Sequence, residues 1–176
     1  MRQSWVTITV AMVAVTVFAT TAVAVTVFAT TASAIDSPRT FTLLEVSLPK
    51  NDHPLGDFSF DQPPAPGDQF TTTNALYRLD GTKRGERVGR AQVMHTFVTG
   101  FGPNFSHKAT VLFVAQLYLP GGTLLLEGNG QVSPDGPSRI TFPVIGGTGI
   151  YSNAGGYMHF RNLGESTRRL EIHLVP

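Results

Sequence analysis

Hydrophobic and polar residues alternate along most of the chain beyond residue 35, with the two-residue period that is typical of β-strands. The most apolar of these runs is residues 109–119, in which six apolar side chains share one face. No part of this region keeps the 3.6-residue period of an amphipathic helix, so the pattern predicts strands throughout. The runs that predict strands are residues 41–48, 75–79, 87–98, 109–119, 123–130, 139–145, 157–163 and 168–175.

Turn-forming residues separate these runs. Asp80-Gly81 has the composition of a hairpin turn, and Pro120-Gly121-Gly122 reverses the chain again. Residues 50–69 are different, because four prolines and two glycines predict a long surface connection without a regular element. Short strands joined by turns rich in glycine and proline predict an all-β barrel or sandwich.

Two glycine clusters interrupt the stretch from Phe142 to Phe160. The first cluster, residues 146–149, ends an apolar run, and the second, residues 155–156, precedes the next predicted strand. Glycines inside strand-rich sequence mark tight corners or close backbone approach. We therefore expect Gly146, Gly147 or Gly149 to adopt a positive φ at a corner of the fold.

The first 34 residues have the features of a targeting segment. Arg2 gives a basic start, residues 5–32 carry no charge, and Ala32-Ser33-Ala34 is a small-x-small cleavage signal. We therefore expect a signal peptide at residues 1–34, cleavage after Ala34, and a secreted protein with one domain at residues 35–176. An uncharged stretch of this length is also long enough for an uncleaved membrane anchor, so that alternative stays open.

The charge balance argues against one class of function. The chain has 13 basic and 12 acidic side chains, and removal of Arg2 with the leader leaves 12 of each. A neutral domain lacks the positive charge that nucleic-acid binding needs, so no nucleic-acid partner is expected.

The chain has no cysteine, and its five histidines are not spaced like metal ligands. We expect neither a metal nor a cofactor.

Several segments resemble one superfamily of barrels. Residues 87–92, RVGRAQ, are similar to a strand of dirigent proteins, and residues 142–157 resemble the strand-turn-strand that dirigent proteins share with allene oxide cyclases. Residues 55–57, 66–68 and 74–77 are similar to allene oxide cyclase segments in the same order. The resemblance implies an eight-stranded antiparallel barrel and a homo-oligomer, either a trimer or a dimer. It also implies an apolar cavity that folds a reactive substrate into one stereochemical outcome.

The resemblance implies particular site residues as well. Glu45 matches a glutamate that polarises the substrate at the cavity floor of allene oxide cyclases, and Asn74 matches an asparagine that positions a substrate oxygen. Ser47 stands where the family has an asparagine that holds a water, which is a departure from the family pattern. A solvent-facing glutamate and a turn-capping asparagine are the alternative readings of Glu45 and Asn74.

Alternation along the strands adds further candidates. His95 shares one face with apolar residues, and a neutral imidazole in a cavity can relay or donate a proton; a core histidine bonded to a carbonyl is the alternative. The aromatic residues Phe97, Phe113, Tyr118 and Tyr151 are candidates for the lining of a ligand cavity, although ordinary core packing accounts for them equally well. We expect catalytic roles for Glu45, Asn74 and His95, and substrate contacts from Ser47, Phe97, Phe113, Tyr118 and Tyr151.

These observations predict a secreted barrel, dirigent-like or allene-oxide-cyclase-like, that binds a small hydrophobic molecule and steers its cyclisation or coupling. Such a protein is a cofactor-independent cyclase or isomerase of the intramolecular lyase type, and it works by holding a flexible substrate in one reactive fold. The alternative is a non-catalytic ligand-binding or structural module at the cell surface. A ligand site needs roughly 300 Å³ or more of mostly apolar space, whereas a structural barrel of this size can be filled by its own side chains.

Overall fold

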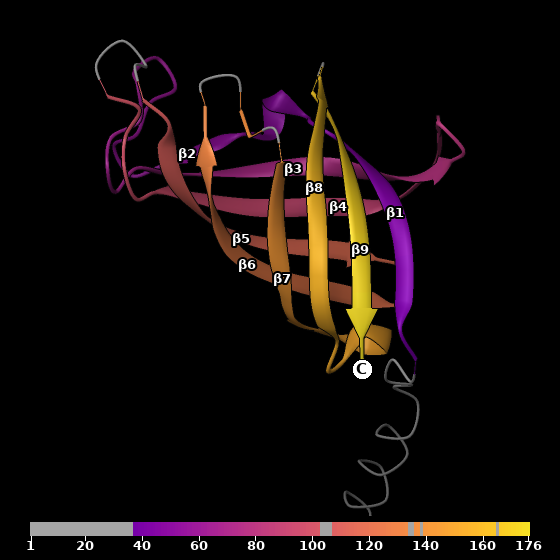
Figure 1. Ribbon diagram of the computed structural model, residues 1–176. Helices are drawn as coiled ribbons and strands as arrows, with labels where there is room; N and C mark the ends of the chain where they lie inside the picture. Colours follow the sequence, from indigo (N-terminus) through magenta and orange to yellow (C-terminus); the bar gives the residue numbers. More distant parts are fainter. Residues whose placement is uncertain (1–36, 103–106, 134–135, 138, 165) are drawn as a thin grey trace, which may run out of the picture. The chain divides into compact units, whose positions relative to one another are not determined.

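The alternating segments form the strands of one antiparallel sheet (Figure 1). The computed structural model describes residues 37–102, 107–133, 136–137, 139–164 and 166–176. Within these ranges the strands are β1 (Arg39–Val46), β2 (His53–Leu55), β3 (Gln69–Asp80), β4 (Lys83–Phe97), β5 (Ala109–Leu119), β6 (Gly122–Val132), β7 (Arg139–Gly147), β8 (Gly155–Gly164) and β9 (Thr167–Val175). Short 3-10 helices, η1 (Pro49–Asn51) and η3 (Gly149–Tyr151), lie in connections between strands.

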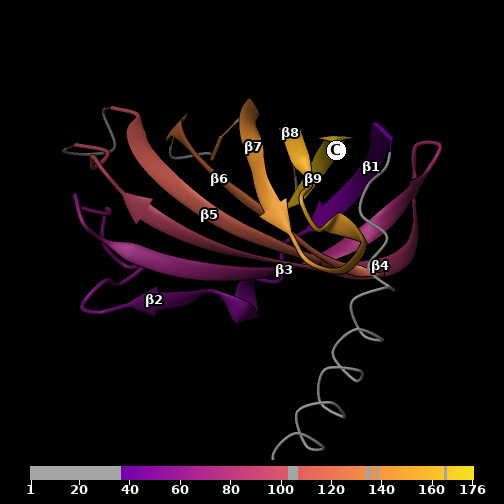
Figure 2. The same cartoon turned by 90° about the horizontal axis from the view of Figure 1, so that it is seen from below.

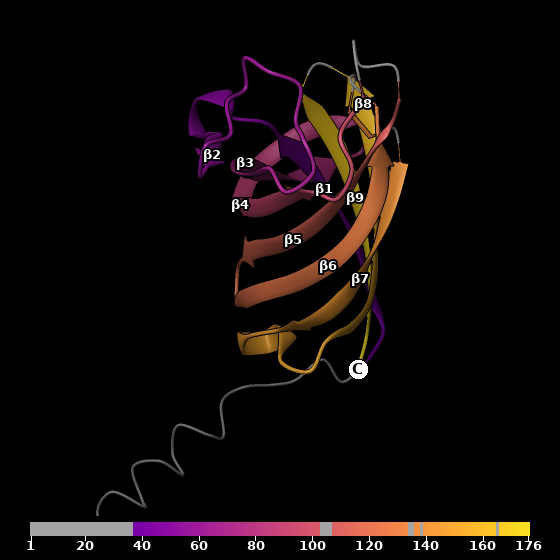
Figure 3. The same cartoon turned by 90° about the vertical axis from the view of Figure 1, so that its left-hand side faces the viewer.

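The sheet closes on itself. Its strand order is β1-β9-β8-β7-β6-β5-β4-β3-β2, and β1 pairs with β3 as well as with β9. Eight strands, β1 and β3 to β9, therefore form a closed antiparallel barrel, which confirms the predicted fold class. Figures 1 and 3 show β7, β8, β9 and β1 forming one wall, which the strands β3 to β6 of the opposite wall cross at a steep angle.

The short strand β2 pairs with the same edge of β3 as β1 does, but at the other end of that edge. It contacts residues 69–71 of β3, whereas β1 pairs with residues 75–78, and Figure 2 shows β2 beside β3 at the rim of the barrel. The prediction that residues 50–69 contain no regular element is wrong for this strand. Pro54 is compatible with it because β2 pairs on one side only, so no ladder donor is required at that position.

Alternate residues of each strand face the inside of the barrel. Leu170, Ile172 and Leu174 of β9 are buried, and so are the inward residues of β5 from Ala109 to Leu117, as the alternation predicts. Large apolar side chains fill one end of the barrel: Leu43, Leu76, Leu124, Leu126, Ile172 and Leu174. None of these six lines the cavity that the barrel encloses elsewhere.

Glycines form the corner between β7 and β8, as expected. Gly146 has a φ of 152° and Gly149 a φ of 62°, so both adopt backbone conformations that favour glycine. Gly147 is required for a different reason, because a Cβ at this position would lie 2.6 Å from the carbonyl oxygens of Thr123 and Tyr151. The corner therefore depends on close backbone approach as much as on positive φ.

We expect Gly149→Ala to destabilise the barrel more than Gly81→Ala does. The two glycines have nearly the same φ, 62° and 60°, so an alanine suffers the same backbone strain at both, roughly 1–2 kcal/mol. A Cβ at Gly149 would also collide with the carbonyl oxygen of Gly121, whereas nothing lies within 4 Å of a Cβ at Gly81. Chemical denaturation should therefore show the larger loss in the free energy of unfolding for Gly149→Ala. Equal losses would contradict the close-approach argument.

The predicted leader, residues 1–34, lies outside the described residues. All described residues belong to one unit of the chain, Ala34–Pro176. Across the residues that the structure describes, there is no helix with the length and apolar character that crossing a membrane requires.

Candidate functional site

The barrel encloses a cavity of about 250 Å³. Most of its surface is apolar and comes from β4 to β8, including the rings of Phe97, Phe113, Phe142 and Phe160. The volume is slightly below the roughly 300 Å³ of the smallest typical ligand pockets, so it suits a compact ligand. The barrel is nevertheless not filled by its own side chains, as a purely structural barrel of eight strands can be.

Polar side chains line the cavity where the barrel closes. We call this region the polar wall, and it consists of Glu45 and Ser47 at the end of β1, Thr72 and Asn74 on β3, and Arg168 on β9. The three strands are neighbours in the sheet, with β1 in the middle. One side of the cavity is therefore polar and the opposite side apolar.

Glu45 and Asn74 form the buried part of the polar wall, and each is only 4% exposed. Glu45 pairs with Leu76 across the β1–β3 ladder, so Asn74, two residues along β3, is its diagonal neighbour. The Asn74 side-chain amide donates a 2.7 Å hydrogen bond from Nδ2 to Oε1 of Glu45. The structure thus brings together two of the three predicted catalytic residues.

The Glu45 carboxyl keeps its proton more readily than a free glutamate does. Burial raises its pKa, and this effect outweighs the positive charge of Arg168 and the hydrogen bond from Asn74, which both lower the pKa. A carboxyl with a raised pKa can donate a hydrogen bond or a proton to a ligand at a pH where an exposed glutamate is ionised.

Arg168 places a positive charge beside this carboxyl. It is the cross-strand neighbour of Glu45 on β9, and its guanidinium donates a hydrogen bond to Oγ of Ser47. The guanidinium carbon lies 6.0 Å from the centre of the Phe160 ring. In the described part of the chain, no carboxylate forms an ion pair with Arg168. The guanidinium is therefore a cation at the cavity wall that affects Glu45 and Asp52 electrostatically without forming an ion pair with either.

His95, the third predicted catalytic residue, lies on the wall next to β3. Its ring stacks on Phe70 with the centroids 4.2 Å apart and meets the edge of Phe113 at 5.2 Å. Its Nε2 lies 3.3 Å from Oγ1 of Thr72. Burial, helped by the charge of Arg168, lowers the pKa of His95 to about 3, so the imidazole is neutral near pH 7. A neutral imidazole in this position can donate or accept a hydrogen bond, but a pKa near 3 makes it a weak base, and its catalytic role stays a prediction.

The depressed pKa of His95 predicts how stability depends on pH. Because folding favours the neutral imidazole, this stabilisation is complete above the unfolded-state pKa, 6.5, and is lost as the pH falls towards 3. Between pH 7 and pH 5 the wild type should lose on the order of 1 kcal/mol more of its free energy of unfolding than His95→Gln does. Urea denaturation at both pH values checks this, with His107→Gln, a change at an exposed histidine, as the control. The expectation fails if His95→Gln and the wild type respond identically.

Asp52 also borders the cavity, although no pattern in the sequence pointed to it. It follows η1 in the connection between β1 and β2. Its Oδ1 is buried without a hydrogen-bond partner among the described residues. Burial raises the pKa of Asp52, against the opposing charges of Arg168 and His53. The sequence around Asp52 has no strand period, so no pattern could indicate which way this side chain points.

The substrate-contact candidates divide into two groups. Ser47, Phe97 and Phe113 line the cavity. Tyr118 is on the opposite face of β5, where its hydroxyl donates a 2.6 Å hydrogen bond to Oε1 of Gln116. Alternation accounts for this, because the all-apolar face of β5 is the one that points inward and Tyr118 is on the other face.

Tyr151 also lies away from the cavity. It is buried in η3 and borders a separate recess together with Phe41, Leu43 and Val88. Its hydroxyl donates a 3.5 Å hydrogen bond to the carbonyl oxygen of Pro120. The glycine corner turns the chain at this position, so strand alternation from β7 does not predict the direction of the ring.

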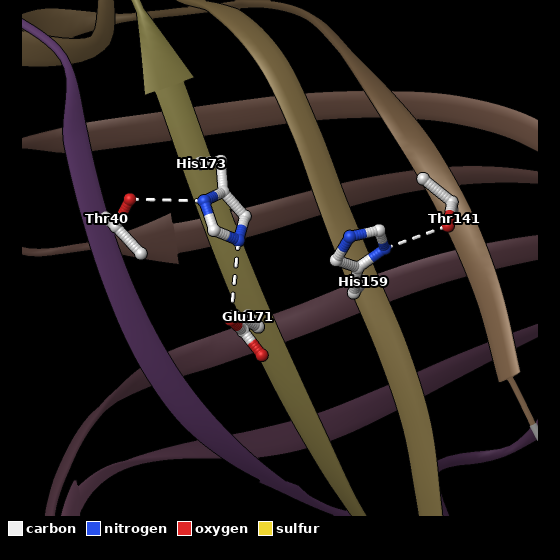
Figure 4. Close-up of polar contacts among 5 residues, drawn as sticks. All are labelled: Thr40, Thr141, His159, Glu171 and His173. Carbon is white, nitrogen blue, oxygen red and sulfur yellow. Dashed lines mark hydrogen bonds and ion pairs between the residues drawn. The ribbon is translucent and has the colours of Figure 1, made fainter.

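Two further histidines lie on the outer face of the barrel (Figure 4). Nδ1 of His173 is 3.1 Å from Oγ1 of Thr40, and its Nε2 is 3.5 Å from the Glu171 carboxylate. Nδ1 of His159 is 2.9 Å from Oγ1 of Thr141. Within the described ranges, no group of three or more histidine, cysteine, aspartate or glutamate side chains is placed to hold a metal ion.

No protein-family model matches this sequence, and no curated protein matches it. Solved structures with a similar fold include a pyocyanin demethylase, with 19% identity over 78% of this chain and 100% of that chain and a TM-score of 0.57. A nonspecific heme-binding cyclase that catalyses a cycloaddition has 20% identity over 78% of this chain and 63% of that chain, with a TM-score of 0.55.

A pterocarpan synthase dirigent protein is 15% identical over 79% of this chain and 94% of that chain, with a TM-score of 0.59. At these identities the likeness shows the fold alone. The chain therefore has the barrel fold of dirigent proteins, which confirms the fold that the sequence resemblance implies.

Proposed function

We propose that this protein binds a small, largely apolar molecule inside the barrel and steers its cyclisation or coupling. The observation that carries the proposal is the Glu45 carboxyl, which is buried and held by Asn74 at the polar wall of an otherwise apolar cavity. An ionisable group in such a place costs stability, so its presence favours a role in chemistry. The proposal is also supported by similar barrels among solved structures, which include a cyclase and a dirigent protein.

The cavity contributes chiefly by restricting the substrate. Its apolar surface holds a flexible molecule in one fold, and this can remove much of the entropic barrier to ring closure. Glu45 donates its proton or a hydrogen bond to a substrate oxygen on which charge develops. Asn74 fixes the direction of the carboxyl, and the neutral His95 forms a hydrogen bond with a second polar atom of the substrate.

Further properties belong to the same proposal. We propose that residues 1–34 are removed on secretion, that the barrel assembles as a trimer or a dimer, and that it acts without a cofactor. One solved barrel of similar fold is a heme-binding cyclase, so cofactor independence needs its own check. An absorption spectrum of the active protein that shows a bound chromophore would contradict it.

A second candidate function is ligand binding without conversion. The observation that favours it is the hydrogen bond between Ser47 and Arg168. In the allene oxide cyclases that the sequence resembles, an asparagine holds a water at the position of Ser47. Here the Ser47 hydroxyl instead accepts a hydrogen bond from the Arg168 guanidinium. A binding module can keep the cavity while lacking the groups that a reaction requires.

One experiment separates the two functions. The purified protein is incubated with a metabolite extract of its source organism, and the extract is compared by liquid chromatography and mass spectrometry before and after incubation. Steered cyclisation predicts that one compound is depleted and that a product of the same mass, with a different retention time, accumulates. A compound that is enriched on the protein but recovered unchanged would instead support ligand binding alone.

A further inference from the structure

The polar wall presents hydrogen-bond acceptors that the described residues do not satisfy. Oδ1 of Asn74 and Oδ1 of Asp52 are both buried, and neither has a partner among the described residues. The amide nitrogen of Asn74 is directed at Glu45, so its oxygen is the atom left for a ligand. A buried acceptor without a donor is unfavourable, and a ligand that brings a donor to this position gains affinity.

The same wall presents hydrogen-bond donors that the protein does not use fully. A guanidinium has five N–H donors, and in the described part of the chain Arg168 donates to Ser47 and pairs with no carboxylate. Arg168 also lines the cavity. A carbonyl, enolate or carboxylate oxygen of a ligand can accept hydrogen bonds from such a group.

We propose that the ligand carries a hydroxyl group next to a carbonyl oxygen, at one end of an apolar body. The carbonyl oxygen accepts hydrogen bonds from Arg168, and the hydroxyl donates to Oδ1 of Asn74. The apolar body packs against the rings of Phe113 on β5 and Phe142 on β7, across the cavity from the polar wall. This inference rests on the proposed function in one respect, because it takes the cavity to be the ligand site.

Two simpler ligand classes fit the wall less well. A hydrocarbon would bury the acceptors of Asn74 and Asp52 without supplying a donor. A carboxylate would satisfy Arg168, but it has no hydroxyl hydrogen to donate and would place negative charge beside these acceptor oxygens. A hydroxyl on the carbon next to a carbonyl offers a donor and an acceptor on adjacent carbon atoms.

Four probes with one apolar body test this inference. Alpha-hydroxyacetophenone carries both groups, acetophenone lacks the hydroxyl, phenylethanol lacks the carbonyl, and ethylbenzene lacks both. Titration calorimetry of the full barrel should show that alpha-hydroxyacetophenone binds about tenfold more tightly than either probe with one group, since each paired group adds a hydrogen bond to a desolvated partner. Ethylbenzene should bind most weakly.

Two variants test which side chains account for the higher affinity of alpha-hydroxyacetophenone. Asn74→Leu should remove the advantage that the hydroxyl gives, and Arg168→Met should remove the advantage that the carbonyl gives. Ethylbenzene should bind each variant at least as tightly as it binds the wild type, because the variants remove polar groups that a hydrocarbon cannot satisfy, and this would show that the cavity is intact. The series on the wild type decides the question even if a variant does not fold.

The outcomes distinguish the inference from the proposed function. Equal affinity for all four probes would mean that water satisfies the polar wall, and it would overturn the hydroxy-carbonyl inference while leaving the cavity as a ligand site. If none of the probes binds, and no compound from the metabolite extract binds either, the cavity is not a ligand site and the proposed function fails as well.

Discussion

Replacing Ala115 with phenylalanine is expected to abolish binding of the cavity's ligand. Ala115 is in the middle of β5, faces inward and lines the cavity. A phenyl ring at this position occupies much of the roughly 250 Å³ that the ligand needs, so we expect a loss of affinity on the order of 100-fold or more. The ring enters existing space, so the barrel should avoid most of the roughly 1–3 kcal/mol that overpacking a filled core costs. Calorimetry with alpha-hydroxyacetophenone measures the affinity, and a thermal melt checks the fold.

Val114→Phe is the matched control for this variant. Val114 is the neighbouring residue on β5 and points to the outer face, away from the cavity. The Val114→Phe substitution adds a ring to the same strand without entering the cavity, so ligand affinity should stay at the wild-type value. If Ala115→Phe binds ligand as well as Val114→Phe does, the ligand site is elsewhere on the protein.

Glu45→Gln should lower turnover of the identified substrate by roughly 100-fold or more, which is typical for the loss of one positioned acid-base or electrostatic group. Glutamine keeps the shape of the side chain and the oxygen that accepts the hydrogen bond from Asn74. Ligand affinity should therefore change little. Single-turnover kinetics measure the chemical step separately from binding.

Glu171→Gln is the control for this substitution. Glu171 lies on the outer face of β9 beside His173, and its side chain is 42% exposed. The Glu171→Gln substitution removes one carboxylate from the barrel without changing the cavity, so turnover should stay at the wild-type rate. Normal turnover in Glu45→Gln would show that Glu45 has a structural role only.

Glu45→Gln should also change how the free energy of unfolding depends on pH. Because burial raises the pKa of Glu45, the folded state favours the protonated carboxyl. Its stabilising contribution is complete below the unfolded-state pKa, 4.5, and is lost as the pH rises through the raised folded-state pKa. The free energy of unfolding of the wild type should therefore fall relative to that of Glu45→Gln as the pH rises above 4.5. Parallel pH profiles would contradict a buried, titrating Glu45.

Strand alternation predicted an all-β barrel or sandwich, and the resemblance to dirigent proteins and allene oxide cyclases supplied the eight-stranded barrel. The strand at residues 109–119 was predicted with the bounds that the structure gives it, because one face is wholly apolar and turns flank both ends. Other strands are longer than their apolar runs. β3 begins at Gln69 instead of residue 75, because the residues before 75 are polar except for Phe70 and so show no apolar alternation.

The candidate site was only partly predictable. Glu45 was identified through resemblance, and Asn74 with it, and both are at the polar wall. Arg168 could have been found from the sequence, since it precedes Leu170 by two residues and so shares the inward face of β9. Asp52 could not, because its position depends on the path of the connection between β1 and β2 and on no local period. Sequence spacing also cannot show that this aspartate approaches the same cavity as Arg168.

The central claim is that the ligand binds inside the barrel with its polar end at the polar wall. A crystal structure of the protein with its retained compound, or with alpha-hydroxyacetophenone, tests this most directly. Our account predicts density within the cavity, with ligand oxygens at hydrogen-bond distance from Glu45 or Asn74 and from Arg168, and with the apolar body against Phe113. Density at the recess beside Tyr151, or on the outer face near His173, with the cavity unchanged, would contradict the account.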